Sequence, residues 1–121
     1  KIEKNVKFLG EISNVENFYK DIDIFILSSY MEGIPNVLLE VQNYGIPIFS
    51  TKVGGVEECV IENYSCYFID SKNHLKSSNK IKKLLSKKSF FFDRKINFKK
   101  TKLKKFLPDN VYRELNKLYY N

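Results

Sequence analysis

The feature that most constrains the fold is a strand–loop–helix pattern that begins at residue 22 and occurs twice. Residues 22–27 form a short apolar run rich in Ile and Phe, which is typical of a buried strand. Gly33 and Pro35 then predict a tight turn, and residues 36–44 have the apolar spacing of an amphipathic helix, which a glycine ends. This first unit therefore predicts a strand, a turn and a helix in that order.

The same order follows immediately along the chain. Residues 46–51 predict a second strand, Gly54 and Gly55 a sharp turn, and residues 56–61 a short helix. A further apolar run at residues 66–69 predicts another strand. Because strands that alternate with helices are joined by crossovers, the sequence predicts an α/β fold, a parallel sheet flanked by helices.

Two carboxylates stand at a fixed spacing in the first unit. Glu32 falls in the loop after the first strand, and Glu40 lies in the helix that follows. Ligands of open parallel sheets bind outside the carboxyl ends of the strands, and a helix start offers free N–H groups to a phosphate. A carboxylate accepts hydrogen bonds from paired hydroxyls, so the stretch indicates a phosphate flanked by two polyols, as in a nucleotide sugar. The alternative is that Glu32 caps a helix and Glu40 is a solvated surface residue.

The motifs of this chain and their spacing resemble those of a known family. The sequence E-G-I-P-N-V-L-L-E at residues 32–40, with G-I-P at 45–47 and V-G-G-V-E-E at 53–58, resembles the donor-binding half of family-4 glycosyltransferases. Residues 6–10 and 19–23 extend the resemblance. These are retaining enzymes with two Rossmann-like domains, the GT-B architecture, so the resemblance implies part of a Rossmann-like C-terminal domain.

The resemblance also implies roles for individual residues. Glu32 is the expected catalytic residue, hydrogen-bonded to the transferred sugar, and Glu40 would hold the ribose hydroxyls. Pro35 has no N–H, so its neighbours would supply the donors to the sugar and diphosphate. The implied donor-binding residues are Gly33, Ile34, Pro35, Asn36, Val37 and Glu40, and the loop-supporting residues are Gly54, Gly55 and Glu58. For Glu58, a charge that complements a helix dipole is the alternative interpretation.

No cofactor or metal is expected; the nucleotide-diphosphate sugar would be the donor substrate. Asp21 and Asp23 spell the D-x-D of metal-dependent glycosyltransferases, but they precede a strand instead of following one. Cys59 and Cys66 make neither a disulfide framework nor a zinc-site spacing. His74, the single histidine, is expected at a helix start on the surface.

The domain organisation predicted from the chain has two parts. Residues 1–70 would form a partial Rossmann-like nucleotide-sugar-binding domain, which includes a strand at 6–9 and a helix at 14–20. In the doubly wound strand order 3-2-1-4-5-6, the strand at 6–9 would be the third and that at 22–27 the fourth, so they would not be neighbours. Relative to the family, the basic diphosphate clamp and the N-terminal acceptor-binding domain would be missing, and the chain alone would be inactive.

Residues 71–121 are expected to form a basic helical tail of the same domain. Residues 71–105 hold thirteen lysines and one arginine against a single acid. The apolar residues of the first helix of this tail are expected to be Leu75, Ile81, Leu84 and Leu85, and Phe90, Phe91 and Phe92 follow. One interpretation is that 72–105 contacts an anionic membrane surface. The other is a solvated helix whose aromatics pack on the sheet or on a missing domain.

A last helix is expected over residues 110–120. Asp109 would be its N-cap, and its buried stripe would consist of Val111, Leu115, Leu118 and Tyr119. This apolar face would lack a partner if, as in GT-B enzymes, the helix crosses to the other domain.

The sequence thus predicts a retaining GT-B glycosyltransferase that uses a nucleotide-diphosphate sugar, such as a UDP-sugar, in bacterial surface-glycan biosynthesis of the lipopolysaccharide or capsule type. It would be cytoplasmic and peripheral at the inner face of the membrane, with no nucleic-acid partner. Two alternatives remain: a basic module that binds lipid or nucleic acid, and another GT-B enzyme such as a sugar-nucleotide epimerase.

Overall fold

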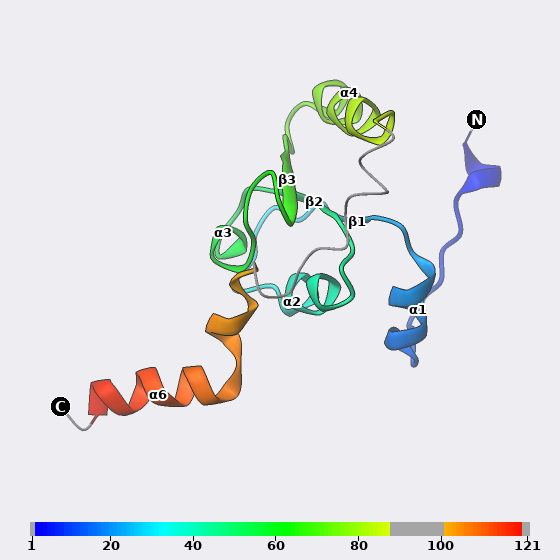
Figure 1. Cartoon of the computed structure of the whole chain (residues 1–121). Coiled ribbons are helices and arrows are strands. Elements are labelled where there is room, and N and C mark those ends of the chain that lie inside the picture. Colours follow the sequence, from blue (N-terminus) through cyan, green and yellow to red (C-terminus); the bar gives the residue numbers. More distant parts are fainter. Residues whose placement is uncertain (1, 88–100, 120–121) are drawn as a thin grey trace.

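The computed structural model describes residues 2–87 and 101–119. Helices and strands alternate along most of the chain (Figure 1), as the sequence pattern predicts. The elements are η1 (Glu3–Asn5), α1 (Val15–Asp21), β1 (Phe25–Leu27), α2 (Asn36–Asn43), β2 (Ile48–Thr51), α3 (Val56–Cys59), β3 (Cys66–Ile69), α4 (His74–Leu85), η3 (Lys102–Phe106) and α6 (Pro108–Tyr119).

The three strands form one parallel sheet in the order β1-β2-β3. The register pairs Phe25 with Ile48 and Ile48 with Cys66, so the carboxyl ends of the strands lie at one edge of the sheet. All residues of the central strand β2 are buried. The α/β fold with a parallel sheet is confirmed, and the strands predicted at 22–27, 46–51 and 66–69 are neighbours in that order.

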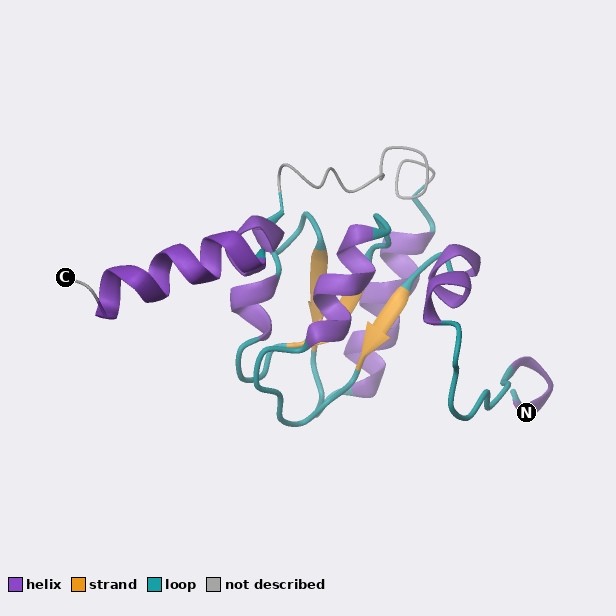
Figure 2. Ribbon diagram, turned by 90° about the horizontal axis from the view of Figure 1, so that it is seen from below, coloured by secondary structure: helices purple, strands orange, loops and turns teal. Residues whose placement is uncertain are grey.

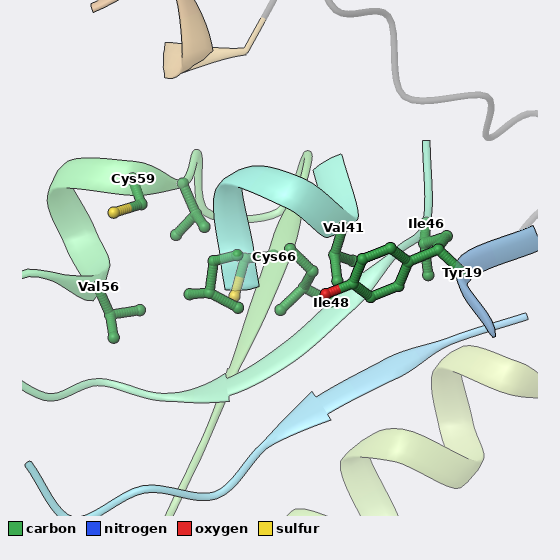
Figure 3. Packing of buried hydrophobic residues seen from close by; sticks show 9 residues of the cluster. Tyr19, Val41, Ile46, Ile48, Val56, Cys59 and Cys66 are labelled. Atoms are coloured by element: carbon green, nitrogen blue, oxygen red, sulfur yellow. The ribbon is translucent and has the colours of Figure 1, made fainter. Parts of the chain in front are cut away.

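Helices cover both faces of the sheet (Figures 1 and 2). Successive side chains of a strand point to opposite faces, and β2 shows the consequence. Ile48 belongs to a cluster with residues of α2 and α3, such as Val41 and Val56 (Figure 3), whereas Phe49 packs with Tyr67 in a second cluster. Ile81, Leu84 and Leu85 of α4 pack against this second cluster. The sheet therefore lies between α2 and α3 on one side and α4 on the other.

Local capping explains where the helices begin and end. The Asn14 side chain accepts a hydrogen bond from Asn17 N–H at 3.0 Å and caps α1, and Asn73 caps α4 by accepting from Lys76 N–H at 2.9 Å. Gly45, with a φ of +73°, follows the end of α2. The helices predicted over 14–20, 36–44 and 56–61 are thus present, with bounds shifted by one or two residues.

The prediction of a strand at residues 6–9 is wrong. No strand lies there, and the side chain of Phe8 is 94% exposed. A strand is stable only when its N–H and C=O groups pair with a neighbour, and within the described residues none pairs with this segment.

The C-terminal helix exists, but three residues of its predicted buried stripe are exposed, as expected if this face lacks a partner. Val111, Leu115 and Leu118 are 42%, 45% and 79% exposed, because α6 projects away from the sheet (Figure 1). Asp109 is not the N-cap, since the helix begins at Pro108, which suits a first helical position.

Helix α4 is present where a basic amphipathic helix was predicted. Three of its four expected apolar residues pack on the sheet, and the fourth, Leu75, is 72% exposed. The predicted aromatic run at Phe90, Phe91 and Phe92 lies outside the described residues. None of the helices that the structure describes is long and apolar enough to cross a membrane.

Candidate functional site

Glu32 lies in the loop that leaves the carboxyl end of β1, and two hydroxyl groups position it. Ser29 Oγ donates a hydrogen bond to Glu32 Oε1 at 2.5 Å. Thr51 Oγ1, at the end of β2, donates to the backbone carbonyl of Ser29 at 2.6 Å. The carboxylate is therefore linked through Ser29 to the end of the central strand.

The turn at Gly54 and Gly55 packs directly on the backbone of this loop. Gly55 N–H donates to the Gly33 carbonyl at 2.9 Å. Gly54 has a φ of +49°, and a Cβ atom built on it would lie 1.8 Å from the Glu32 carbonyl oxygen. A Cβ on Gly55 would lie 2.4 Å from the Gly33 carbonyl oxygen. The structure thus brings together four predicted site residues from the two loops, and the close approach requires glycine at both turn positions.

The start of α2 is open. Pro35 is buried at the N-cap position and makes no side-chain capping bond, and the first turn carries no acidic side chain. An uncapped helix start presents N–H groups and the positive end of the helix dipole. Asn36 and Ile34 beside it are exposed, while Val37 is partly buried. This end of α2 can accept an anion, in keeping with the predicted role of residues 33–37.

Glu40 lies farther along α2 and contacts α1. Tyr19 Oη donates a hydrogen bond to Glu40 Oε2 at 2.7 Å. Tyr19 is only 6% exposed and its ring centroid is 5.2 Å from that of Tyr44, whereas Glu40 is exposed. Burial, followed by the bond to Glu40, raises the pKa of Tyr19 to about 12. The hydroxyl therefore stays protonated and donates at neutral pH.

Glu58 contacts the glycine turn through its backbone and the C-terminal segment through its side chain. Its N–H donates to the Gly55 carbonyl at 3.0 Å. Its carboxylate pairs with the Lys105 ammonium of η3 at 3.1 Å, and Lys102 of the same element donates to the Glu57 carbonyl at 2.6 Å. These two lysines connect η3 to α3, while Leu103 between them is buried. The Glu58 side chain thus pairs with the C-terminal segment, while its backbone belongs to the turn that packs on the Glu32 loop.

A cavity of about 360 Å³ lies where the carboxyl ends of all three strands meet. Every lining residue except Ile69 carries a polar group in its side chain, and one of them is His74 at the start of α4, an exposed residue, as predicted. The lining residues are Ser28, Tyr30, Thr51, Ile69, Asp70, Ser71, His74 and Ser77. This is the sheet edge at which open α/β folds bind ligands.

The described residues hold no group of three or more His, Cys, Asp or Glu side chains that could bind a metal ion. Asp21 ends α1 and Asp23 precedes β1, so both lie toward the amino end of the strand, away from the Glu32 loop. Cys59 and Cys66 are free and buried, and burial raises the pKa of the Cys66 thiol to about 12. That the protein works without a metal stays a prediction.

Three further residues of this region, namely Ser29, Thr51 and Tyr19, were not predicted as site residues. A signal existed for the first two, since both are hydroxyl residues at the carboxyl ends of adjacent predicted strands. Tyr19 belongs to the 19–23 segment of the family resemblance, but its bond to Glu40 could not be predicted, because its partner is 21 residues away in another helix.

The chain is similar in sequence to a protein family and to several known proteins. The family described as "Glycosyl transferases group 1" matches residues 1–105. The chain is 25% identical over 115 residues to the capsular polysaccharide biosynthesis glycosyltransferase CapM of Staphylococcus aureus, covering 95% of this chain and 30% of that protein. It is 41% identical over 69 residues to the Vi polysaccharide biosynthesis protein VipC/TviE of Salmonella typhi, covering 57% of this chain and 12% of that protein.

A third relative is an α-1,4-N-acetyl-D-galactosaminyltransferase of Campylobacter jejuni whose named acceptor is an undecaprenol-diphosphate-linked saccharide. The identity is 27% over 114 residues, which cover 93% of this chain and 32% of that enzyme. The chain therefore spans less than a third of the length of each of these relatives. Since the family match extends over most of its length, the chain belongs to the glycosyl transferases group 1 family.

Proposed function

We propose that this chain supplies the donor-binding half of a retaining GT-B glycosyltransferase of the family-4 type, with a nucleotide-diphosphate sugar as donor. The observation that carries the proposal is the packing of the Gly54–Gly55 turn on the Glu32–Gly33 backbone. This packing holds the E-G-I-P loop beside the uncapped start of α2 at the carboxyl end of the sheet. Family membership supports the transferase assignment.

Each part of the loop has a role in the proposed chemistry. As the bond between the anomeric carbon and the diphosphate oxygen breaks, positive charge develops on the sugar and negative charge on the leaving nucleoside diphosphate. Glu32 would accept hydrogen bonds from the sugar hydroxyls and stabilise the positive charge. The backbone N–H groups of residues 33, 34, 36 and 37, with the helix dipole, would stabilise the diphosphate. Glu40 would accept from the ribose hydroxyls.

In this proposal, sugar transfer also requires parts of the enzyme that this chain does not supply. An acceptor-binding domain and a basic diphosphate clamp would complete the enzyme, because proximity and orientation of both substrates can contribute about 7–11 kcal/mol. We therefore expect no sugar transfer by residues 1–121 alone. The relatives' names support a surface glycan as the product. We further propose that a peripheral enzyme makes it at the cytoplasmic face of the membrane.

The roles of the two carboxylates can be tested separately by titration calorimetry. Each variant is titrated with a nucleoside diphosphate and with the matching nucleotide sugar, and UDP and a UDP-sugar are the first pair to use. Glu40→Gln should weaken the binding of both ligands about ten- to a hundredfold, because a hydrogen bond to a charged group is lost. Glu32→Gln should leave the affinity for UDP unchanged and reduce turnover in the complete enzyme. Glu62→Gln is the matched control, since Glu62 is exposed near the amino end of β3.

Two results would contradict the proposal. An equal loss of UDP affinity in Glu32→Gln and Glu40→Gln would mean that the sugar and ribose roles are assigned wrongly. No change in either variant, in a protein that binds UDP, would place the donor elsewhere.

A further inference from the structure

The hydrogen bond between Tyr19 and Glu40 joins a buried residue to an exposed one. Tyr19 belongs to the large core cluster, where its ring lies beside Val41 and Ile46 (Figure 3). Its ring centroid lies 5.8 Å from that of Phe18 and 5.2 Å from that of Tyr44. The position of its hydroxyl is therefore set by packing in the core, whereas Glu40 is exposed on the surface of α2.

An exposed glutamate has several rotamers, and binding that requires one of them loses side-chain entropy. The bond of 2.7 Å from Tyr19 Oη to Glu40 Oε2 selects one rotamer before any ligand arrives. A carboxylate offers about four lone-pair sites over its two oxygens, so Tyr19 occupies one and leaves the others for further donors. Two neighbouring hydroxyls, such as those of a ribose, match the remaining acceptor sites.

We propose that Tyr19 is a positioning residue that fixes the Glu40 carboxylate in the orientation in which it accepts the ribose hydroxyls of the donor. This inference rests on the proposed function, because it requires Glu40 to be the ribose ligand. Tyr19 itself does not touch the donor and acts only through Glu40. The protonation of Tyr19 agrees with this role, since a tyrosine hydroxyl is already a donor in the physiological pH range, and burial and the carboxylate raise its pKa further.

The test compares a nucleoside diphosphate with its 2′,3′-dideoxy analogue, which lacks both ribose hydroxyls. Calorimetric titration of the complete protein with UDP and dideoxy-UDP measures what the ribose hydroxyls contribute. Tyr19→Phe keeps the ring and removes the hydroxyl. We expect this variant to bind UDP about three- to tenfold more weakly, because the carboxylate loses its orientation, and to bind dideoxy-UDP as the wild type does.

Two further variants make the test specific. Tyr44→Phe is the matched control, since it removes a hydroxyl from the same aromatic cluster and no hydrogen bond joins Tyr44 to Glu40 in the described part of the chain. It should leave both affinities unchanged. In a Glu40→Gln background, Tyr19→Phe should cause no further loss of UDP affinity, because residues that act as one unit are not additive.

The outcomes separate this inference from the proposed function. If Glu40→Gln weakens UDP binding and Tyr19→Phe does not, the ribose role of Glu40 stands and the positioning role of Tyr19 is overturned. If Tyr19→Phe weakens UDP and dideoxy-UDP equally, its role is structural and the inference is again overturned. If the wild type binds both ligands equally, the ribose role of Glu40 fails, and the positioning role fails with it.

Discussion

Gly10 and Gly54 both have left-handed backbone torsions, but only one of them has a close neighbour. Gly10 has a φ of +66° and nothing within 4 Å of the position of a Cβ, whereas Gly54 has the Glu32 carbonyl oxygen 1.8 Å away. The two residues therefore separate the cost of the torsion from the cost of the contact.

Gly10→Ala should lower the free energy of unfolding by about 1–2 kcal/mol, the cost of a left-handed torsion for a residue with a Cβ. Gly54→Ala should cost more, because the Glu32 loop must also move, and it should weaken donor binding as well. Urea unfolding and titration with UDP measure the two effects. Equal costs of the two substitutions would mean that the Gly54–Glu32 contact relaxes freely.

At this scale the sequence predicted which residues belong to the candidate site better than it predicted the contacts between them. Glu32, Glu40 and the glycine pair could be identified because their spacing along the chain carries the pattern. The hydrogen bonds from Ser29 and Tyr19 could not, because they depend on how the loop after β1 and helix α1 pack in space. The assigned functional roles of all these residues stay predictions.

The elements were predictable wherever their burial depends on local periodicity. β3 has the predicted bounds, and α2 follows its apolar spacing. The strand predicted at 6–9 and the stripe on α6 failed because the same apolar residues need a partner surface, which the periodicity of one segment does not specify. The division of the chain at residue 70 stays a prediction, although α4 packs on the same sheet as the residues before it.

The C-terminal segment gives a test at the scale of elements. Leu103 of η3 is 6% exposed, whereas Leu118 of α6 is 79% exposed. Leu103→Ala should lower the free energy of unfolding by about 2–4 kcal/mol, because it leaves a cavity between η3 and the helices it covers. Leu118→Ala should change it by less than about 0.5 kcal/mol. A comparable loss in both variants, measured by urea unfolding, would mean that the apolar face of α6 is covered in solution.

Over the whole molecule, positive charge is concentrated in residues 71–105. The apolar residues Ile81, Leu84 and Leu85 of α4 pack on the sheet, whereas Leu75 near its start is 72% exposed, so this helix offers a membrane its charged face and one apolar side chain. An interaction of α4 with lipid would then be mainly electrostatic.

If the basic segment binds membranes, the protein should bind vesicles that contain phosphatidylglycerol, and salt should weaken the binding. Lys82 and Lys83 are both exposed on α4. Replacing both by Gln should reduce binding severalfold, at about 1 kcal/mol for each lysine near the surface, whereas Lys4→Gln with Lys7→Gln should have little effect. Sedimentation with vesicles measures this. Equal binding to neutral vesicles, or no binding, would favour the solvated-helix interpretation.

The position of β1 in the sheet also affects how the chain behaves at high concentration. Within the described residues, β1 pairs only with β2, and Ile26, the middle residue of β1, is 47% exposed. An edge of this kind offers backbone donors and acceptors to any other extended chain, including another copy of itself. Its three residues allow only a short ladder. We therefore expect aggregation of the isolated chain to begin at this edge, so that solubility during purification would depend more on covering β1 than on the excess of lysines.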